Sequence, residues 1–283
     1  MTRTLLLTAV AILISTTFGA AAASIPPDAN GAEKALAASP RHGEYVDIAM
    51  PGSDVKLKSW VVYPERKEKA GVVIVIHEIF GLSDWVRSVA DQLATDGFIA
   101  IAPDMLSGRG PGGGGTAEIG AKNVGQEIRK LPPDDVNARI DAVRDYATKL
   151  PAANGKFATI GFCWGGGASF RYATHEPKLN AAIVYYGAAP RKGDGGKEAD
   201  AEALKKIQAP VSGHYGGDDA RVNATIDETK KILTDAGKSY TPHIYDGAGH
   251  GFLRQQGDRN GANKKASEQA WPETIAVLKK NLE

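Results

Sequence analysis

The only cysteine of the 283-residue chain lies in the segment Gly-Phe-Cys-Trp-Gly-Gly, residues 161–166. A short apolar strand pattern at 156–160 precedes this segment, and a run with helical character follows it. Small residues on both sides of a nucleophile are typical of a sharp turn between a strand and a helix, where the neighbouring backbones pack closely. A helix N-terminus also favours the anionic form of a thiol. The pattern predicts that Cys163 is a nucleophile; the alternative is a small buried hydrophobic residue.

Two further candidates follow Cys163 in the chain order that nucleophile, acid and histidine have in α/β-hydrolases. Asp219 comes after one predicted strand, and His250 lies between two glycines just after the last predicted strand. A histidine at this place can accept the thiol proton and later give it to the leaving group, while the aspartate orients its ring. Asp218 is the alternative acid, and a loop histidine without a catalytic role is the alternative interpretation of His250.

The other histidines lack such a context. We expect His77, His214 and His243 to be structural, and His42 and His175 to lie at the surface. The sequence has no H-x-x-x-H or C-x-x-C spacing, so we predict no metal site and no cofactor.

Alternating strand and helix patterns surround these residues. The continuous apolar runs 71–76 and 98–102 are typical of parallel strands buried on both faces. Further strands are predicted at 181–187, 210–216 and 239–245, and an antiparallel edge hairpin is predicted at 44–48 and 56–63. Helices are predicted at 84–94, 117–129, 134–148, 201–207, 224–236 and 264–282. The order predicts an α/β-hydrolase fold, with a mostly parallel central sheet and helices on both faces.

The length and net charge of the chain narrow the range of folds and binding partners that it can have. A chain of 283 residues with a net charge of +1 and no long basic run argues for one α/β domain and against a nucleic-acid partner. Residues 1–23 are typical of a signal peptide, 24–41 of a loose lead-in, and 42–283 of the α/β-hydrolase domain. We therefore expect export to the periplasm or secretion, without stable membrane insertion after cleavage; an uncleaved membrane anchor is the alternative. An exported chain with a single cysteine forms no internal disulfide, which favours a reactive thiol.

Four segments carry a resemblance to a known family. The sequence Val-Ile-His-Glu-Ile-Phe-Gly at 75–81, the segment around Cys163, Tyr-Gly-Gly-Asp-Asp-Ala-Arg-Val at 215–222 and Gly-His-Gly-Phe at 249–252 occur in matching order. From about Glu44 to the C-terminus the chain resembles the dienelactone hydrolase family, also named carboxymethylenebutenolidase. The resemblance implies an α/β-hydrolase with a Cys-Asp-His triad, a monomer, that hydrolyses enol-lactones such as dienelactone to maleylacetate.

The resemblance also implies roles for four more residues. Glu78 matches a glutamate thought to hold the resting thiol and to take up its proton. The backbone N–H groups of Ile79 and Trp164 match the oxyanion hole, and Arg254 matches an arginine that binds the substrate carboxylate. The alternatives are a surface carboxylate for Glu78 and a solvated charge for Arg254.

Several features of the sequence differ from the pattern of the family. They affect the expected substrate more than the expected mechanism. These are the signal-like N-terminus, the glycine-rich loop 108–115, the polar insert 192–197 and the bulk of Trp164. The sequence favours an exported hydrolase of a small ester or lactone that works through an acyl-thioester. A non-catalytic binder of small carboxylates, or a thiol redox sensor, is the alternative from another class. A cysteine peptidase is a third option, but nothing in the sequence indicates a peptide cleft.

Overall fold

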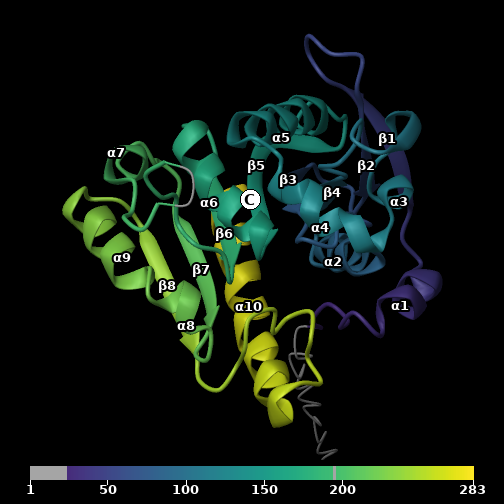
Figure 1. The fold of residues 1–283 in the computed structure, drawn as a ribbon. Coiled ribbons are helices and arrows are strands. Elements are labelled where there is room, and N and C mark those ends of the chain that lie inside the picture. Colours follow the sequence, from purple (N-terminus) through teal and green to yellow (C-terminus); the bar gives the residue numbers. More distant parts are fainter. Residues whose placement is uncertain (1–23, 194–195) are drawn as a thin grey trace, which may run out of the picture.

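One sheet of eight strands organises the described part of the chain, residues 24–193 and 196–283 of the computed structural model (Figure 1). The predicted signal peptide, 1–23, lies outside these residues. The strand order is β1-β2-β4-β3-β5-β6-β7-β8. The pairs β1–β2 and β2–β4 are antiparallel and the others are parallel, which confirms the edge hairpin and the mostly parallel sheet. The strands are β1 Gly43–Ala49, β2 Lys56–Val62, β3 Ala70–Ile76, β4 Ile99–Pro103, β5 Ala153–Phe162, β6 Ala181–Tyr185, β7 Val211–Gly216 and β8 Tyr240–Tyr245.

Helices cover both faces of the sheet because the central strands are apolar on both faces. Every residue of β3 is buried. Val72 and Ile74 pack on the face covered by α4, α5 and α6, whereas Val73 and Val75 pack on the face covered by α2 and α10. The helices are α1 Ala32–Ala38, α2 Asp84–Thr95, α3 Thr116–Ile119, α4 Ala121–Arg129, α5 Pro133–Ala147, α6 Trp164–His175, α7 Ala201–Leu204, α8 Ala220–Asn223, α9 Ile226–Asp235 and α10 Ala262–Leu282, with short 3-10 helices at Pro111–Gly113 and Arg259–Gly261.

The segment 24–41 differs from the predicted loose lead-in. It contains α1, which packs against α2, and its Ala32 is fully buried. Trp85 Nε1 donates to the Pro27 carbonyl at 3.2 Å, and Gln92 Nε2 donates to Ser24 Oγ at 3.0 Å. The small alanines that gave the segment its loose appearance are good helix formers and allow a close approach to α2. The segment is therefore part of the folded domain.

Three predicted helices differ from those in the structure. The helix predicted at 117–129 consists of α3 and α4, because Gly120 between them has φ 76°, a left-handed value that interrupts the helix. The helix predicted at 224–236 is preceded by a separate short helix, α8, and begins as α9 only at Ile226. The predicted helix 201–207 ends at Leu204. The additional helix α8 begins directly after Asp219, which caps its N-terminus, so α8 helps to position a candidate site residue.

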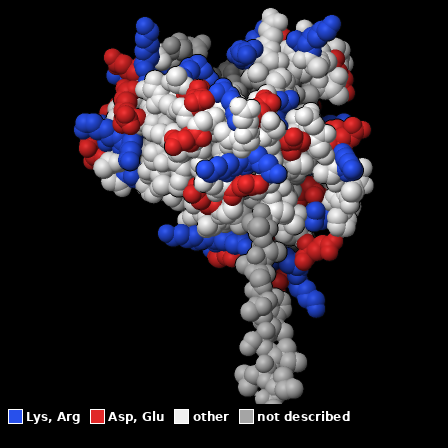
Figure 2. All heavy atoms as spheres, turned by 90° about the horizontal axis from the view of Figure 1, so that it is seen from below, with Lys and Arg blue, Asp and Glu red and all other residues white. Residues whose placement is uncertain are grey.

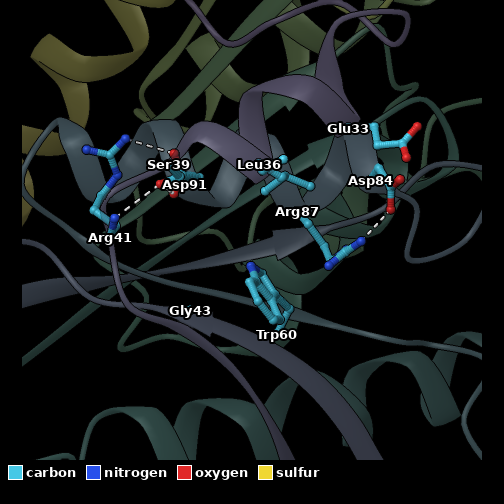
Figure 3. Close-up of a pocket in the computed structure, with 10 residues that line it drawn as sticks. Glu33, Leu36, Ser39, Arg41, Gly43, Trp60, Asp84, Arg87 and Asp91 are labelled. Carbon is cyan, nitrogen blue, oxygen red and sulfur yellow. Dashed lines mark hydrogen bonds and ion pairs between the residues drawn. The ribbon is translucent and has the colours of Figure 1, made fainter.

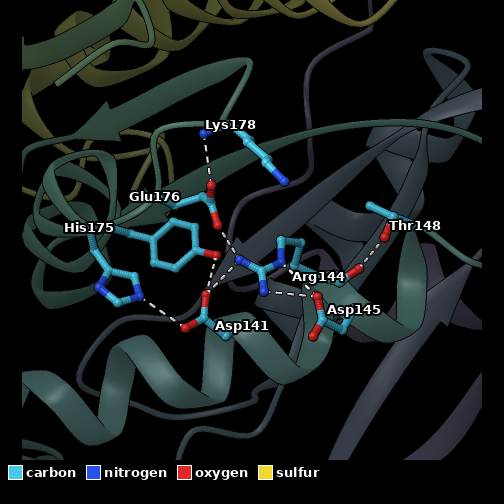
Figure 4. A network of polar contacts seen from close by, with 8 residues as sticks. Asp141, Arg144, Asp145, Thr148, His175, Glu176 and Lys178 are labelled. Carbon is cyan, nitrogen blue, oxygen red and sulfur yellow. Dashed lines mark hydrogen bonds and ion pairs between the residues drawn. The ribbon is translucent and has the colours of Figure 1, made fainter.

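A polar network joins α6 to α5 (Figure 4). Tyr172 Oη donates to Asp141 at 2.8 Å, and Arg144 forms ion pairs with Asp141, at 2.9 Å, and with Glu176. Since α6 begins directly after Cys163, these contacts fix the helix whose first turn adjoins the candidate nucleophile.

The surface seen in Figure 2 carries basic and acidic side chains interspersed, without a large region of one sign. Within residues 24–193 and 196–283, no helix combines the length and the hydropathy that crossing a membrane requires.

Candidate functional site

The turn between β5 and α6 holds Cys163 in a strained backbone conformation. Its φ of 55° and ψ of −113° are rare for a residue with a side chain. The Cys163 N–H donates to the Tyr185 carbonyl at 3.0 Å, and its own carbonyl accepts from Gly167 N at 3.1 Å. This geometry is that of a nucleophile elbow, which lifts the side chain out of the sheet at its carboxyl edge.

Two glycines of the segment are required by close approach of the backbone. A Cβ at Gly161 would lie 1.9 Å from the Gly165 carbonyl oxygen, and a Cβ at Gly165 would lie 2.3 Å from the Ile76 carbonyl oxygen. Real Cβ atoms do not approach oxygen so closely, so a side chain at either position would force the elbow apart. The glycine pattern in the sequence therefore has a direct steric cause.

His250 and Asp219 form a hydrogen-bonded pair. His250 Nδ1 lies 2.5 Å from Asp219 Oδ2, and the aspartate is buried. The neighbouring Asp218 instead pairs with Arg259 at 2.5 Å, so the structure places Asp219, and not Asp218, on the imidazole. Burial alone would raise the pKa of Asp219, but the hydrogen bond and charge of His250 outweigh it and hold that pKa below its ordinary value.

The imidazole of His250 also contacts Cys163. Burial alone would lower the His250 pKa, but the hydrogen bonds to Asp219 and to the Cys163 side chain outweigh burial and raise it to about 9. Near neutral pH the ring therefore holds a proton beside the sulfur. The structure thus brings together the three residues that the sequence placed in nucleophile, acid and histidine order.

Glu78 lies on the turn after β3 and is almost fully buried. Burial raises the pKa of its carboxyl to about 7, although the charges of Arg254 and His250 oppose this shift. Arg254 Nε lies 3.0 Å from Glu78 Oε1, but its N–H does not point at that oxygen, which has no hydrogen-bond partner. The Arg254 guanidinium also lies over the Phe80 ring, 4.4 Å from its centre. The surface-carboxylate interpretation of Glu78 is therefore wrong.

His77 has a more specific place than the sequence indicated. Its Nδ1 lies 2.9 Å from the Glu78 carbonyl, and its Nε2 lies 3.0 Å from Met105 N. A carbonyl only accepts and an amide only donates, so Nδ1 carries the proton and Nε2 is the acceptor. The ring holds the carbonyl of the peptide bond between Glu78 and Ile79, and in a trans peptide the Ile79 N–H points the opposite way. His77 therefore orients one of the two predicted oxyanion-hole donors.

A cavity of about 910 Å³ opens over the elbow. Cys163, His250, Ile79, Trp164 and Tyr186 are among the residues that line it. The Tyr186 hydroxyl is buried and has no hydrogen-bond partner, and the tyrosine ring lies 5.1 Å from the His250 ring. Sequence reasoning missed this donor, whose only signal is its place immediately after β6. Arg254 does not line the cavity, and its predicted contact with substrate stays a prediction.

A second cavity, of about 410 Å³, lies between α1, α2 and the edge strands (Figure 3). Its two arginines are both paired, Arg41 with Asp91 at 2.9 Å and Arg87 with Asp84 at 2.5 Å. The first pair attaches the segment around α1 to α2, whereas the second lies within α2. No group of His, Cys, Asp and Glu suited to a metal ion occurs among residues 24–193 and 196–283.

The parallel sheet with helices on both faces and the strand–turn–helix at Cys163 define the α/β-hydrolase class. The chain belongs to the dienelactone hydrolase family, whose model matches residues 57–282.

Relatives span nearly the same extent of chain. A provisionally named carboxymethylenebutenolidase of Saccharolobus solfataricus is 27% identical over 267 residues, which cover 83% of this chain and 98% of the relative. A protein of Escherichia coli strain K12 with the same provisional name is 29% identical, over 74% of this chain and 76% of its own length. The crystal structure of a provisionally named dienelactone hydrolase of Klebsiella pneumoniae is 26% identical, with a TM-score of 0.72, and covers 84% of this chain and 98% of that one. The family and these names indicate a hydrolase.

Proposed function

We propose that the protein hydrolyses enol-lactones or small carboxylic esters, with Cys163 as the nucleophile, His250 as the acid–base and Asp219 as the group that orients it. The observation that carries this proposal is the strained elbow at Cys163 beside the 2.5 Å pair of His250 and Asp219. An ordinary buried cysteine does not need a left-handed backbone, and strain of this kind occurs where a side chain must be presented to a substrate.

In the first step, the Cys163 sulfur, as a thiolate, attacks the carbonyl carbon of the ester or lactone. The carbonyl π electrons move to the oxygen, and the N–H groups of Ile79 and Trp164 stabilise that oxyanion. When the C–O bond breaks, the acyl group stays on sulfur as a thioester, and the imidazolium of His250 gives its proton to the leaving oxygen. An enolate leaving group is weakly basic and needs little help from this proton.

In the second step, water attacks the thioester carbonyl. His250, now neutral, takes a proton from that water, so the imidazolium is restored when the carboxylic acid leaves and the C–S bond breaks. The acid releases its own proton to solvent at neutral pH. Asp219 holds the imidazole with Nε2 toward the reacting atoms throughout, and its carboxylate stabilises the positive ring.

Glu78 supplies a place for the thiol proton. A buried carboxyl with a pKa of about 7 exchanges a proton easily near neutral pH, whereas an ordinary exposed glutamate does not. Its Oε1 lies beside the charged Arg254 but accepts no hydrogen bond, so it can take up a proton when the thiol releases one. This role agrees with the one implied by the family resemblance.

Hydrolysis of dienelactone beside p-nitrophenyl acetate tests the proposal, on the wild type and on Cys163→Ala. We expect turnover of at least one of the two substrates and its loss in the variant. Turnover of the aryl ester alone keeps the mechanism and assigns another ester as the substrate. Wild-type turnover that persists in Cys163→Ala would refute the nucleophile, and an inactive wild type that binds small carboxylates would support the non-catalytic alternative.

A further inference from the structure

Four arginines line the cavity above the elbow: Arg129, Arg171, Arg191 and Arg221. Among the described residues that line it, none is an aspartate or a glutamate. The whole chain carries a net charge of only +1, and the face in Figure 2 mixes both signs. The excess of positive charge is therefore a property of this cavity, where low-dielectric walls strengthen its field.

Two of these arginines, Arg129 and Arg221, form no ion pair within the described part of the chain, although the charge of Arg221 helps to lower the pKa of Asp219. Arg191 forms an ion pair with Glu228 at 2.9 Å. Arg129 donates only to the Gly125 carbonyl of its own helix, at 3.0 Å, and no carboxylate of the described residues pairs with it or with Arg221. A guanidinium has five N–H donors, so Arg129 retains most of its hydrogen-bonding capacity.

Arg129 and Arg221 approach the nucleophile from different elements. Arg129 is the last residue of α4, and Arg221 belongs to α8, which follows β7. In Figure 1, α4 and α8 lie on opposite sides of β5, the strand that leads into the elbow. The two guanidinium groups therefore come from separate elements of the lining of a cavity of about 910 Å³, which can hold more than one anionic group.

We propose that the natural substrate carries at least two anionic groups, carboxylates or phosphates, one held by Arg129 and the other by Arg221, with the reacting carbonyl between them at Cys163. This inference rests on the proposed ester-hydrolase function and narrows its substrate to polyanionic esters or lactones. The fork of a guanidinium matches both kinds of anion with two parallel hydrogen bonds, which provide orientation as well as affinity. Arg254, already paired with Glu78, is not needed for this recognition.

A binding experiment tests the inference without catalysis. Tricarballylate, with three carboxylates, and butyrate, with one, are titrated calorimetrically into the protein at low salt. We expect tricarballylate to bind at least about 100-fold more tightly, and Arg129→Gln or Arg221→Gln each to weaken it about tenfold, as expected for a charge-assisted hydrogen bond. Added salt should weaken it too. Arg66→Gln is the matched control, because Arg66 lies between β2 and β3 and pairs with Glu68 and Glu283. Equal binding of both acids, or an equal loss in the control, would overturn the inference.

A kinetic experiment separates this inference from the proposed function. The mono-aryl ester of tricarballylate is compared with aryl butyrate, a neutral ester. We expect Arg129→Gln and Arg221→Gln each to raise KM for the anionic ester about tenfold and to raise KM for aryl butyrate by a much smaller factor, whereas the control Arg66→Gln should change neither. Arginine-dependent binding without turnover of either ester would refute the proposed function alone. Cys163-dependent turnover that is no faster on the anionic ester than on the neutral one would refute the polyanion inference alone.

Discussion

Replacement of Glu78 by glutamine should change the pH dependence of stability. Burial raises the Glu78 pKa from 4.5 to about 7 in the folded chain. A carboxyl that holds its proton more tightly when folded contributes stability that is fully present below pH 4.5 and is lost as the pH rises through about 7. At about 1.4 kcal/mol for each pH unit between the two values, the loss is about 3 kcal/mol. The side chain is only 6% exposed, so solvent screening reduces this figure little.

Reversible urea unfolding, followed by tryptophan fluorescence, measures this effect between about pH 4 and pH 8. The free energy of unfolding of the wild type minus that of Glu78→Gln should fall by about 3 kcal/mol across this range, since every other titrating group is common to both proteins. As a matched comparison, the same difference in the free energy of unfolding is measured between Arg254→Gln and the double variant Arg254→Gln/Glu78→Gln. Arg254 lowers the Glu78 pKa, so its removal should make the fall larger. A difference that does not change with pH would refute the reasoning about the buried carboxyl.

Three other substitutions have defined outcomes. Asp219→Asn should lower kcat/KM by roughly 10³- to 10⁴-fold. The same substitution should lower the His250 pKa from about 9. In a pH–rate profile, the loss of activity at high pH, where the His250 ring loses its proton, should therefore move to lower pH. An unchanged profile at high pH would contradict the pairing of His250 with Asp219. His77→Leu should reduce kcat with little change in KM, and His77→Asn, which keeps a donor for the Glu78 carbonyl, should recover part of it; equal losses would argue against a positioning role. Gly165→Ala should cost several kcal/mol of stability, on the order of 3 or more, measured by urea unfolding, because its Cβ would meet a β3 carbonyl; wild-type stability would disprove the steric argument.

The catalytic candidates were predictable because their signals are local. The close approach of Gly161 to the Gly165 carbonyl requires residues without a side chain. The glycines around Cys163 therefore predict the turn directly from the sequence. Asp219 and His250 follow strands that the periodicity identifies, and the carboxyl ends of parallel strands meet at one edge of the sheet. Their pairing in the structure follows from the predicted topology.

Features that depend on distant contacts were not predictable. The role of His77 depends on Met105, and the arginines of the cavity come from elements far apart in the chain. The segment around α1 appeared loose because its stability comes from α2, not from its own composition. Export stays a prediction, since it depends on residues 1–23, which lie outside the described part of the chain.

Trapping of the acyl-enzyme tests the central claim most directly. The protein is mixed with p-nitrophenyl acetate, quenched in acid within the first turnovers, digested, and analysed by mass spectrometry. The account predicts one acetyl group on the peptide that contains Cys163, released by hydroxylamine as expected for a thioester, and absent from Cys163→Ala. Asp219→Asn should form the adduct much more slowly, in line with its lower kcat/KM. Turnover with the acetyl group on another residue, or no adduct while Cys163→Ala remains as active as the wild type, would contradict the account.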